Sequence, residues 1–135
     1  MATKIFVNLP VKNLDKTKIF FAALGYTFNE QFTDENAACM IISETIFAML
    51  LVEPFFKGFI DKDIVDATKS TEVLIALSTD SRAEVDDLVN KALAAGGTET
   101  RPAQDHGFMY TRSFNDLDGH IWELVYMESM PENPS

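Results

Sequence analysis

The feature that most constrains the fold is an order of strands and helices that occurs twice along the chain. In the first half, an alternating apolar run over Thr3–Val11 predicts a strand, and an amphipathic segment between Asn13 and Gly25 predicts a helix. Three further strands are predicted, at Tyr26–Phe32, Ala37–Ser43 and Ile46–Val52. The resulting order is β-α-β-β-β.

The second half repeats this order. Val73–Ser78 has the pattern of an apolar strand, and Ser81 with Glu84 three residues later has the pattern of a helix capping box. Apolar residues at helical spacing follow, and Gly96-Gly97 ends the predicted helix. Three more strands are predicted, at Thr98–Arg101, Phe108–Phe114 and His120–Met127. Two matching βαβββ modules indicate a duplication and an α+β fold, in which a curled mixed sheet surrounds a central cleft.

The whole chain of 135 residues is long enough for one domain with one core. The first module covers about residues 1–53 and the second about residues 71–128, which leaves a linker over 54–70 and a tail over 129–135. Apolar residues near helical spacing predict that the linker is an amphipathic helix packed on the core, with a lid or a subunit contact as the alternative. We expect the tail to be frayed.

Charge and composition exclude several classes of partner. The formal net charge is −10 at pH 7, which argues against nucleic acid, because that ligand needs a basic face, and against an anionic membrane surface. No apolar run reaches the length of a membrane span and no signal peptide is visible, so we expect a cytoplasmic protein. The single cysteine, Cys39, lies in an apolar run and is expected to be buried.

A turn and a strand near residue 120 provide the first candidate functional group. The segment Asp116-Leu117-Asp118-Gly119 is a turn signal, because Gly119 can adopt a positive φ and aspartate side chains can bond to the backbone. The strand that follows is apolar on both faces, so we expect it to be covered on both sides, and it contains one carboxylate, Glu123. A buried carboxylate is costly unless it is paired, protonated or bound to a metal, so we expect the functional site around Glu123.

Other candidate side chains precede this strand. Tyr110 and Arg112 alternate onto one face of the neighbouring strand. If that face lines the cleft, Arg112 pairs with Glu123 or binds an anionic ligand group; if it faces outward, Arg112 is a solvated charge. His106 is either an exposed loop histidine or a general base at the mouth of the cleft. The chain contains no phosphate-binding glycine loop, nucleophile elbow or zinc-protease motif.

Three pairs of segments together resemble the vicinal oxygen chelate superfamily, the group of glyoxalases, bleomycin resistance proteins and extradiol dioxygenases. They are Leu9–Thr17 with Phe20–Tyr26, Ile75–Ser81 with Ala94–Gly97, and Asp116–Gly119 with Glu123. The resemblance covers almost the whole chain and implies the duplicated fold described above. It also implies a homodimer, because members of this fold often pair.

The resemblance also identifies where a metal would be bound. The metal enzymes of the superfamily typically place one ligand on each of four strands, often two histidines and two glutamates. On this chain the histidine positions fall near Phe6 and at Leu74, and one acid position falls within Ile46–Val52, which contains no acid. Only Glu123 matches. Because such sites need about three protein ligands, no metal and no other cofactor is predicted.

The leading hypothesis is a small-molecule-binding protein of the glyoxalase/bleomycin-resistance type with a degenerate, metal-free site. The residues expected to line that site are Phe6, Asn8, Leu50, Leu74, Phe108, Tyr110, Arg112 and Glu123. The alternative is a lyase or isomerase of the glyoxalase type that uses Glu123 as acid/base, supported by His106, Tyr110 or Arg112. A third possibility is a protein–protein module whose cleft holds only core side chains.

Overall fold

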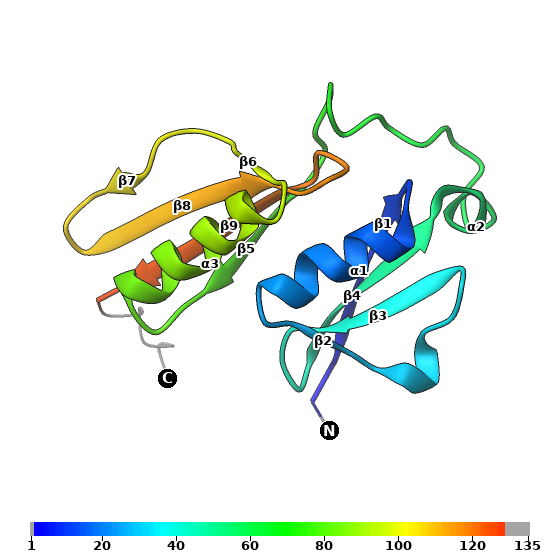
Figure 1. Ribbon diagram of the computed structural model, residues 1–135, viewed down its shortest axis with the longest axis horizontal. Helices are drawn as coiled ribbons and strands as arrows, with labels where there is room; N and C mark the ends of the chain where they lie inside the picture. The colour runs from blue at the N-terminus through cyan, green and yellow to red at the C-terminus, as the bar shows by residue number, and fades with distance from the viewer. Residues whose placement is uncertain (1, 129–135) are drawn as a thin grey trace. The chain divides into compact units, whose positions relative to one another are not determined.

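A computed structural model describes residues 2–128, and the expected frayed tail lies outside this part of the chain. The chain divides into two units, Met1–Asp66 and Ala67–Ser135, and each contains one β-sheet with a helix on one face (Figure 1). The two sheets have four and five strands. The α+β class and the two βαβββ modules are therefore confirmed.

The first unit orders its strands β1-β4-β3-β2. Its first strand runs parallel to its last, and the other pairings are antiparallel. The strands are β1 (Ile5–Val11), β2 (Thr27–Phe28), β3 (Ala37–Ile41) and β4 (Ile46–Val52). Helix α1 (Leu14–Ala23) connects β1 to β2, and its apolar side packs on one face of the sheet.

Helix α1 begins and ends where the sequence indicates. The side chain of Asn13 accepts a hydrogen bond from the backbone N of Lys16 at 3.0 Å, and Gly25 adopts a φ of +103° after the last turn. The core between helix and sheet is formed by apolar side chains with almost no exposed area, among them Leu9, Val11, Phe20, Phe21, Met40, Ala48 and Leu50. Cys39 is also buried, as predicted.

Two segments of this unit differ from the predicted elements. In place of a strand over Tyr26–Phe32, β2 is followed by a 3₁₀ turn, η1 (Glu30–Phe32), because the side chain of Asn29 accepts a hydrogen bond from the backbone N of Gln31. In place of a helix across the linker, α2 covers only Glu53–Lys57. The chain turns at Gly58, and Phe59 beyond it is 70% exposed.

The second unit orders its strands β5-β9-β8-β6, with β7 also paired to β8. Its first and last strands again run parallel, and β8 is antiparallel to β9. The strands are β5 (Leu74–Ser78), β6 (Thr98–Glu99), β7 (Gln104–Asp105), β8 (Met109–Asn115) and β9 (Ile121–Met127). The edge beside β8 is thus made of two short strands in place of the one predicted.

Helix α3 (Arg82–Ala94) covers one face of this second sheet. Its capping residue is Ser81, whose hydroxyl accepts a hydrogen bond from the backbone N of Glu84 at 3.0 Å, as the capping box predicts. Its buried side chains Val85, Val89 and Ala92 face the buried strand residues Phe114, Trp122 and Leu124. The opposite face of the sheet, called the open face below, carries the alternate residues of β5, β8 and β9.

None of the helices within residues 2–128 has both the length and the apolar character that a bilayer crossing requires. The cytoplasmic location expected from the sequence stays a prediction.

Candidate functional site

The strand register of the second sheet decides which predicted site residues share a face. Ser113 lies opposite Glu123, and Arg112 lies opposite Leu124. Because directly opposed residues point to the same side of a sheet, Glu123 belongs to the open face and Arg112 to the face covered by α3. The suggested pairing of Arg112 with Glu123 is therefore wrong.

Arg112 instead binds two carboxylates on the helix side of the sheet. Its Nη1 donates to Asp86 Oδ1 at 3.1 Å, and its Nη2 donates to Glu99 Oε2 at 3.2 Å. The Tyr110 hydroxyl donates to the same oxygen of Asp86 at 2.7 Å. The hydrogen bond from Tyr110 is the main cause of a lowered pKa of Asp86, and the hydrogen bond from Arg112 adds to it. The hydrogen bond to Asp86 raises the pKa of Tyr110. These contacts join α3, β6 and β8.

His106 and Phe108 lie in the turn between β7 and β8. Arg82, the first residue of α3, holds this turn: its Nη1 donates to Asp105 Oδ2 at 2.8 Å and its Nη2 to the carbonyl oxygen of Gly107 at 2.7 Å. The bond from Arg82 lowers the pKa of Asp105. Phe108 is 61% exposed in this turn, one residue before the strand that was expected to contain it.

Glu123 is half-buried, and it is the one charged residue among the open-face positions of β5, β8 and β9 in residues 2–128. Those positions are Leu74, Ala76, Ser78, Met109, Thr111, Ser113, Asn115, Ile121, Glu123, Val125 and Met127. The sequence predicted that β9 is covered on both faces. Trp122 and Leu124 are buried under α3, but the residues that alternate with them are partly exposed, so only one face is fully covered within this unit.

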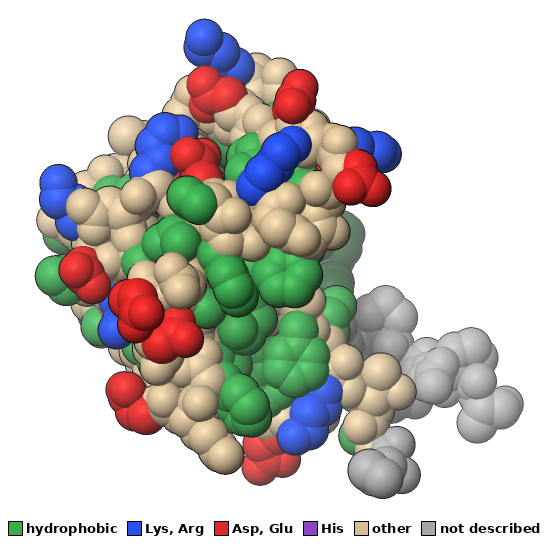
Figure 2. Space-filling view, turned by 90° about the vertical axis from the view of Figure 1, so that its right-hand side faces the viewer, with side chains coloured by type: hydrophobic (Ala, Val, Ile, Leu, Met, Phe, Trp, Pro, Cys, Tyr) green, Lys and Arg blue, Asp and Glu red, His purple; other side chains and the backbone are tan. Residues whose placement is uncertain are grey.

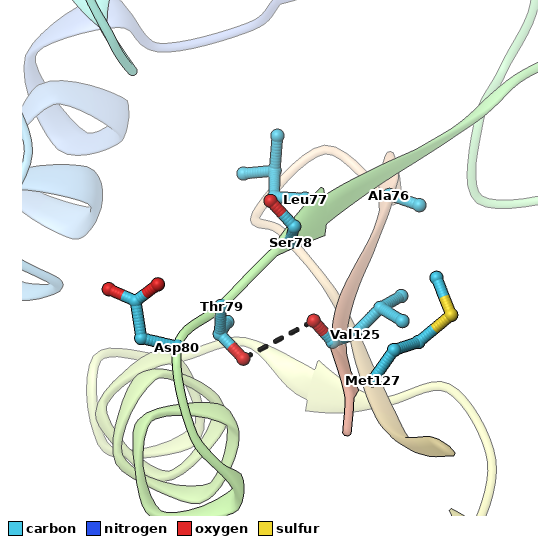
Figure 3. Close-up of a pocket in the computed structure, with 7 residues that line it drawn as sticks. All are labelled: Ala76, Leu77, Ser78, Thr79, Asp80, Val125 and Met127. Carbon is cyan, nitrogen blue, oxygen red and sulfur yellow. Dashed lines mark hydrogen bonds between the residues drawn. The ribbon is translucent and has the colours of Figure 1, made fainter. Parts of the chain in front are cut away.

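A pocket of about 330 Å³ opens at the carboxyl ends of β5 and β9 (Figure 3). It is lined by Ala76, Leu77, Ser78, Thr79, Asp80, Val125 and Met127. The Thr79 hydroxyl donates to the carbonyl oxygen of Val125 at 3.2 Å, which joins the segment after β5 to β9. Ala76 is paired with Glu123 across the two strands, so Glu123 lies on the same face beside the pocket. The volume is within the range of small-molecule sites.

The predicted site residues of the first unit are also divided between two faces. Phe6 pairs with Phe47, and their rings are stacked with centroids 4.9 Å apart on the face away from α1. Phe6 is 51% exposed, and Asn8 lies on the same face two residues later. Leu50 has no exposed area and packs in the core beneath α1, because β4 is apolar on both sides and Leu50 lies on the helix side. It lines no open surface of this unit.

A buried carboxylate exists in the second unit, but it belongs to Asp116. Its Oδ1 accepts hydrogen bonds from the backbone N of Asp118 and of His120, both at 3.0 Å, and its Oδ2 accepts one from the Trp122 indole at 3.0 Å. Asp116 is 6% exposed, and this burial raises its pKa. The Asp-x-Asp-Gly motif predicted the backbone bonds correctly; the bond from Trp122 has no sequence signal.

Comparison with known proteins identifies the family. The family model described as "Bleomycin resistance protein-like N-terminal" matches residues 3–43. The structure of hypothetical protein SA1046 from S. aureus shares 30% sequence identity with a TM-score of 0.78, and the match covers 93% of this chain and 95% of that one. The chain belongs to the glyoxalase/bleomycin resistance protein/dioxygenase superfamily.

Two further solved structures share the fold at lower identity. A glyoxalase-related enzyme from Fulvimarina pelagi is 18% identical with a TM-score of 0.82, over 98% of this chain and 94% of that one. The fosfomycin resistance protein FosX from Listeria monocytogenes is 20% identical with a TM-score of 0.65, over 93% of each chain. No curated protein sequence matches the chain.

The two strand registers identify equivalent positions in the two units. In the parallel pair of the first unit Asn8 lies opposite Met49, and in the parallel pair of the second unit Ala76 lies opposite Glu123. With Phe6 and Leu74 taken as equivalent positions of the duplication, Asn8 corresponds to Ala76 and Met49 to Glu123.

The residues at the metal-ligand positions implied by the resemblance are mostly not the usual donors to a divalent metal. At the four ligand positions that the family resemblance implies, Glu123 supplies an oxygen, whereas Phe6, Leu74 and a residue of β4 near Ala48 or Met49 do not. A thioether is a soft donor suited to other metals, and the two hydrocarbon side chains donate nothing. Among residues 2–128, no three His, Cys, Asp or Glu side chains form a group that could hold a metal ion.

Proposed function

We propose that the protein binds a small molecule on the open face of its second sheet, without a divalent cation. The observation that supports this most is the composition of the ligand positions, where Phe6, Met49 and Leu74 replace donors. The pocket beside Glu123 provides the space for a ligand.

The lining of this pocket favours a ligand with an apolar or aromatic body. Ala76, Leu77, Val125 and Met127 supply hydrocarbon and thioether surface, and Ser78 supplies a hydroxyl. Each 100 Å² of apolar area removed from water stabilises binding by about 2.5 kcal/mol. Polar groups in such a pocket mainly orient the ligand.

The alternative, a glyoxalase-like lyase or isomerase with Glu123 as acid/base, has less support. Acid/base catalysis needs the participating groups within hydrogen-bonding reach of one substrate. Tyr110 and Arg112 lie on the opposite face of the sheet and are bonded to Asp86. His106 lies in the turn between β7 and β8.

We also propose that the protein is a homodimer. Figure 2 shows one face of the molecule on which apolar side chains gather in a continuous area. Exposed apolar residues of the first unit include Phe6 at 51%, Phe55 at 40% and Phe59 at 70%. Large exposed apolar areas in a protein commonly mark interaction surfaces. Analytical ultracentrifugation measures the subunit number, and a purely monomeric protein at micromolar concentration would contradict the proposal.

Native mass spectrometry of freshly purified protein, combined with elemental analysis, tests the absence of a metal. We expect no stoichiometric zinc, nickel, manganese or iron. One tightly bound divalent ion per chain would contradict the proposal.

A melting-temperature screen tests ligand binding separately. A ligand that binds only the folded state at a hundred times its Kd stabilises it by about 2.7 kcal/mol. We expect compounds with apolar or aromatic bodies to raise the melting temperature. If only small, highly charged metabolites do so, the proposed ligand body is wrong.

A further inference from the structure

Among the described residues, the open face of the second sheet carries one carboxylate and no basic side chain. Within residues 67–128, none of the open-face positions of β5, β8 and β9 is Lys, Arg or His, and one is Glu123. A second carboxylate, that of Asp80, lines the pocket. Neither carboxylate forms an ion pair among the described residues.

Three of the five Lys and Arg residues within 67–128 form ion pairs away from this face. The ion pairs are Arg112 with Asp86 and Glu99 beneath α3, Arg82 with Asp105 at the β7–β8 turn, and Lys91 with Asp87 along α3. Lys69 and Arg101 lie in loops outside the strands. Within the described residues, Asp80 is thus the one charged side chain in the pocket lining and has no ion-pair partner, on a chain whose net charge is −10.

The pocket combines this charge with apolar surface. Figure 3 shows the carboxylate of Asp80 at one end of the lining and the side chains of Ala76, Val125 and Met127 at the other. Asp80 and Ser78 are exposed, so a ligand can reach both without disturbing an existing contact of the Asp80 carboxylate. An anionic group here would be repelled by both carboxylates, whereas an ammonium group would be attracted.

We propose that this pocket selects organic cations: ligands with an apolar body that carry a protonated amine. This inference rests on the proposed function and specifies its ligand class. The apolar body lies against Ala76, Val125 and Met127, and the ammonium group approaches Asp80.

Three probes with one apolar body and different charges test this selectivity: 4-phenylbutylamine, 4-phenylbutan-1-ol and 4-phenylbutanoate. We expect calorimetric titration at low ionic strength to give the tightest binding for the amine, weaker binding for the alcohol and the weakest for the carboxylate. Added salt should weaken the binding of the amine but not that of the other two probes, because salt screens the attraction between exposed charges.

Matched variants locate the effect. Asp80→Asn should weaken binding of the amine by roughly fivefold, the upper value for an exposed ion pair. Glu123→Gln should weaken it by less, because Glu123 lies outside the pocket lining, beside Ala76. Both changes should affect binding of the alcohol less than binding of the amine. Glu72→Gln is the control, since it removes the same charge from an exposed residue that precedes β5, at the other end of the strand from the pocket. All three variants must retain the parent melting temperature, which is expected for exposed or half-exposed side chains.

Three results would overturn the inference: equal affinity for amine and alcohol, equal effects of Asp80→Asn and Glu72→Gln, or no binding of any probe. In each case a compound found in the melting-temperature screen would leave the proposed small-molecule binding in place. The absence of any stabilising compound in that screen would count against the proposed function itself.

Discussion

Replacement of Gly119 by alanine probes the contact between the β8–β9 turn and the segment that precedes β5. Gly119 has a φ of +92°, a backbone conformation that residues with a side chain adopt only at a cost of about 1–2 kcal/mol. A Cβ at this position would also lie 2.8 Å from the carbonyl carbon and oxygen of Ala67 and 2.8 Å from the backbone N of Thr68. Backbone atoms cannot rotate away as a flexible side chain can.

The expected loss is the sum of the two effects. Overpacking of a well-packed region costs about 1–3 kcal/mol, so Gly119→Ala should lower the free energy of unfolding by about 2–5 kcal/mol. Gly107→Ala is the matched control in the same unit: its φ is +83°, and an added Cβ would have no atom within 4 Å. In that variant the free energy of unfolding should fall only by the backbone-conformation cost, about 1–2 kcal/mol.

Urea unfolding followed by tryptophan fluorescence measures both variants. The chain has one tryptophan, and Trp122 is buried in the second unit beside Asp116, so its emission reports the unit that contains both glycines. The difference between the two losses isolates the contact with Ala67 and Thr68. Equal losses for Gly119→Ala and Gly107→Ala would refute the close approach of these two segments.

Two further predictions concern buried polar groups. The hydroxyl of Thr17 is buried in α1 and has no hydrogen-bond partner within residues 2–128. Thr17→Val should therefore leave the free energy of unfolding unchanged or raise it by about 1 kcal/mol in urea titrations; a loss of similar size would indicate a bonded hydroxyl. Because burial raises the pKa of Asp116, its contribution to stability is full below the ordinary aspartate pKa and is lost as pH rises through the folded value. The stability of Asp116→Asn relative to the parent should therefore improve across that pH interval, and a constant difference would contradict the raised pKa.

The elements of the fold were predictable because their ends are encoded locally. Asn13 and Ser81 begin the two long helices through their own side chains, and Gly25 follows the first with a positive φ. The Asp-Gly turn before β9 was predictable for the same reason. Linker residues such as Phe59 have helical spacing, but spacing alone does not show whether a helix continues beyond a glycine or finds a surface to pack on.

The candidate site was less predictable because it depends on register between strands far apart in sequence. The pairing of Ser113 with Glu123 decides which residues of β8 share a face with Glu123. The local sequence contains no signal for that pairing. The same limit applies to β4, where both faces are apolar and the sequence does not show that Leu50 faces the helix. Charge partners such as Asp86 for Arg112 come from a separate helix.

The parallel pairing within each unit has a consequence for synthesis on the ribosome. In both sheets the last strand to emerge, β4 or β9, is inserted between strands made earlier. Until β9 is available, β5 and β8 have no partner that joins them, and the apolar side of α3 lacks the indole of Trp122 beneath it. Assembly of each unit must therefore await its final strand, and a nascent chain stalled before Ile121 would display two unpaired strand edges, those of β5 and β8, to chaperones or to other chains.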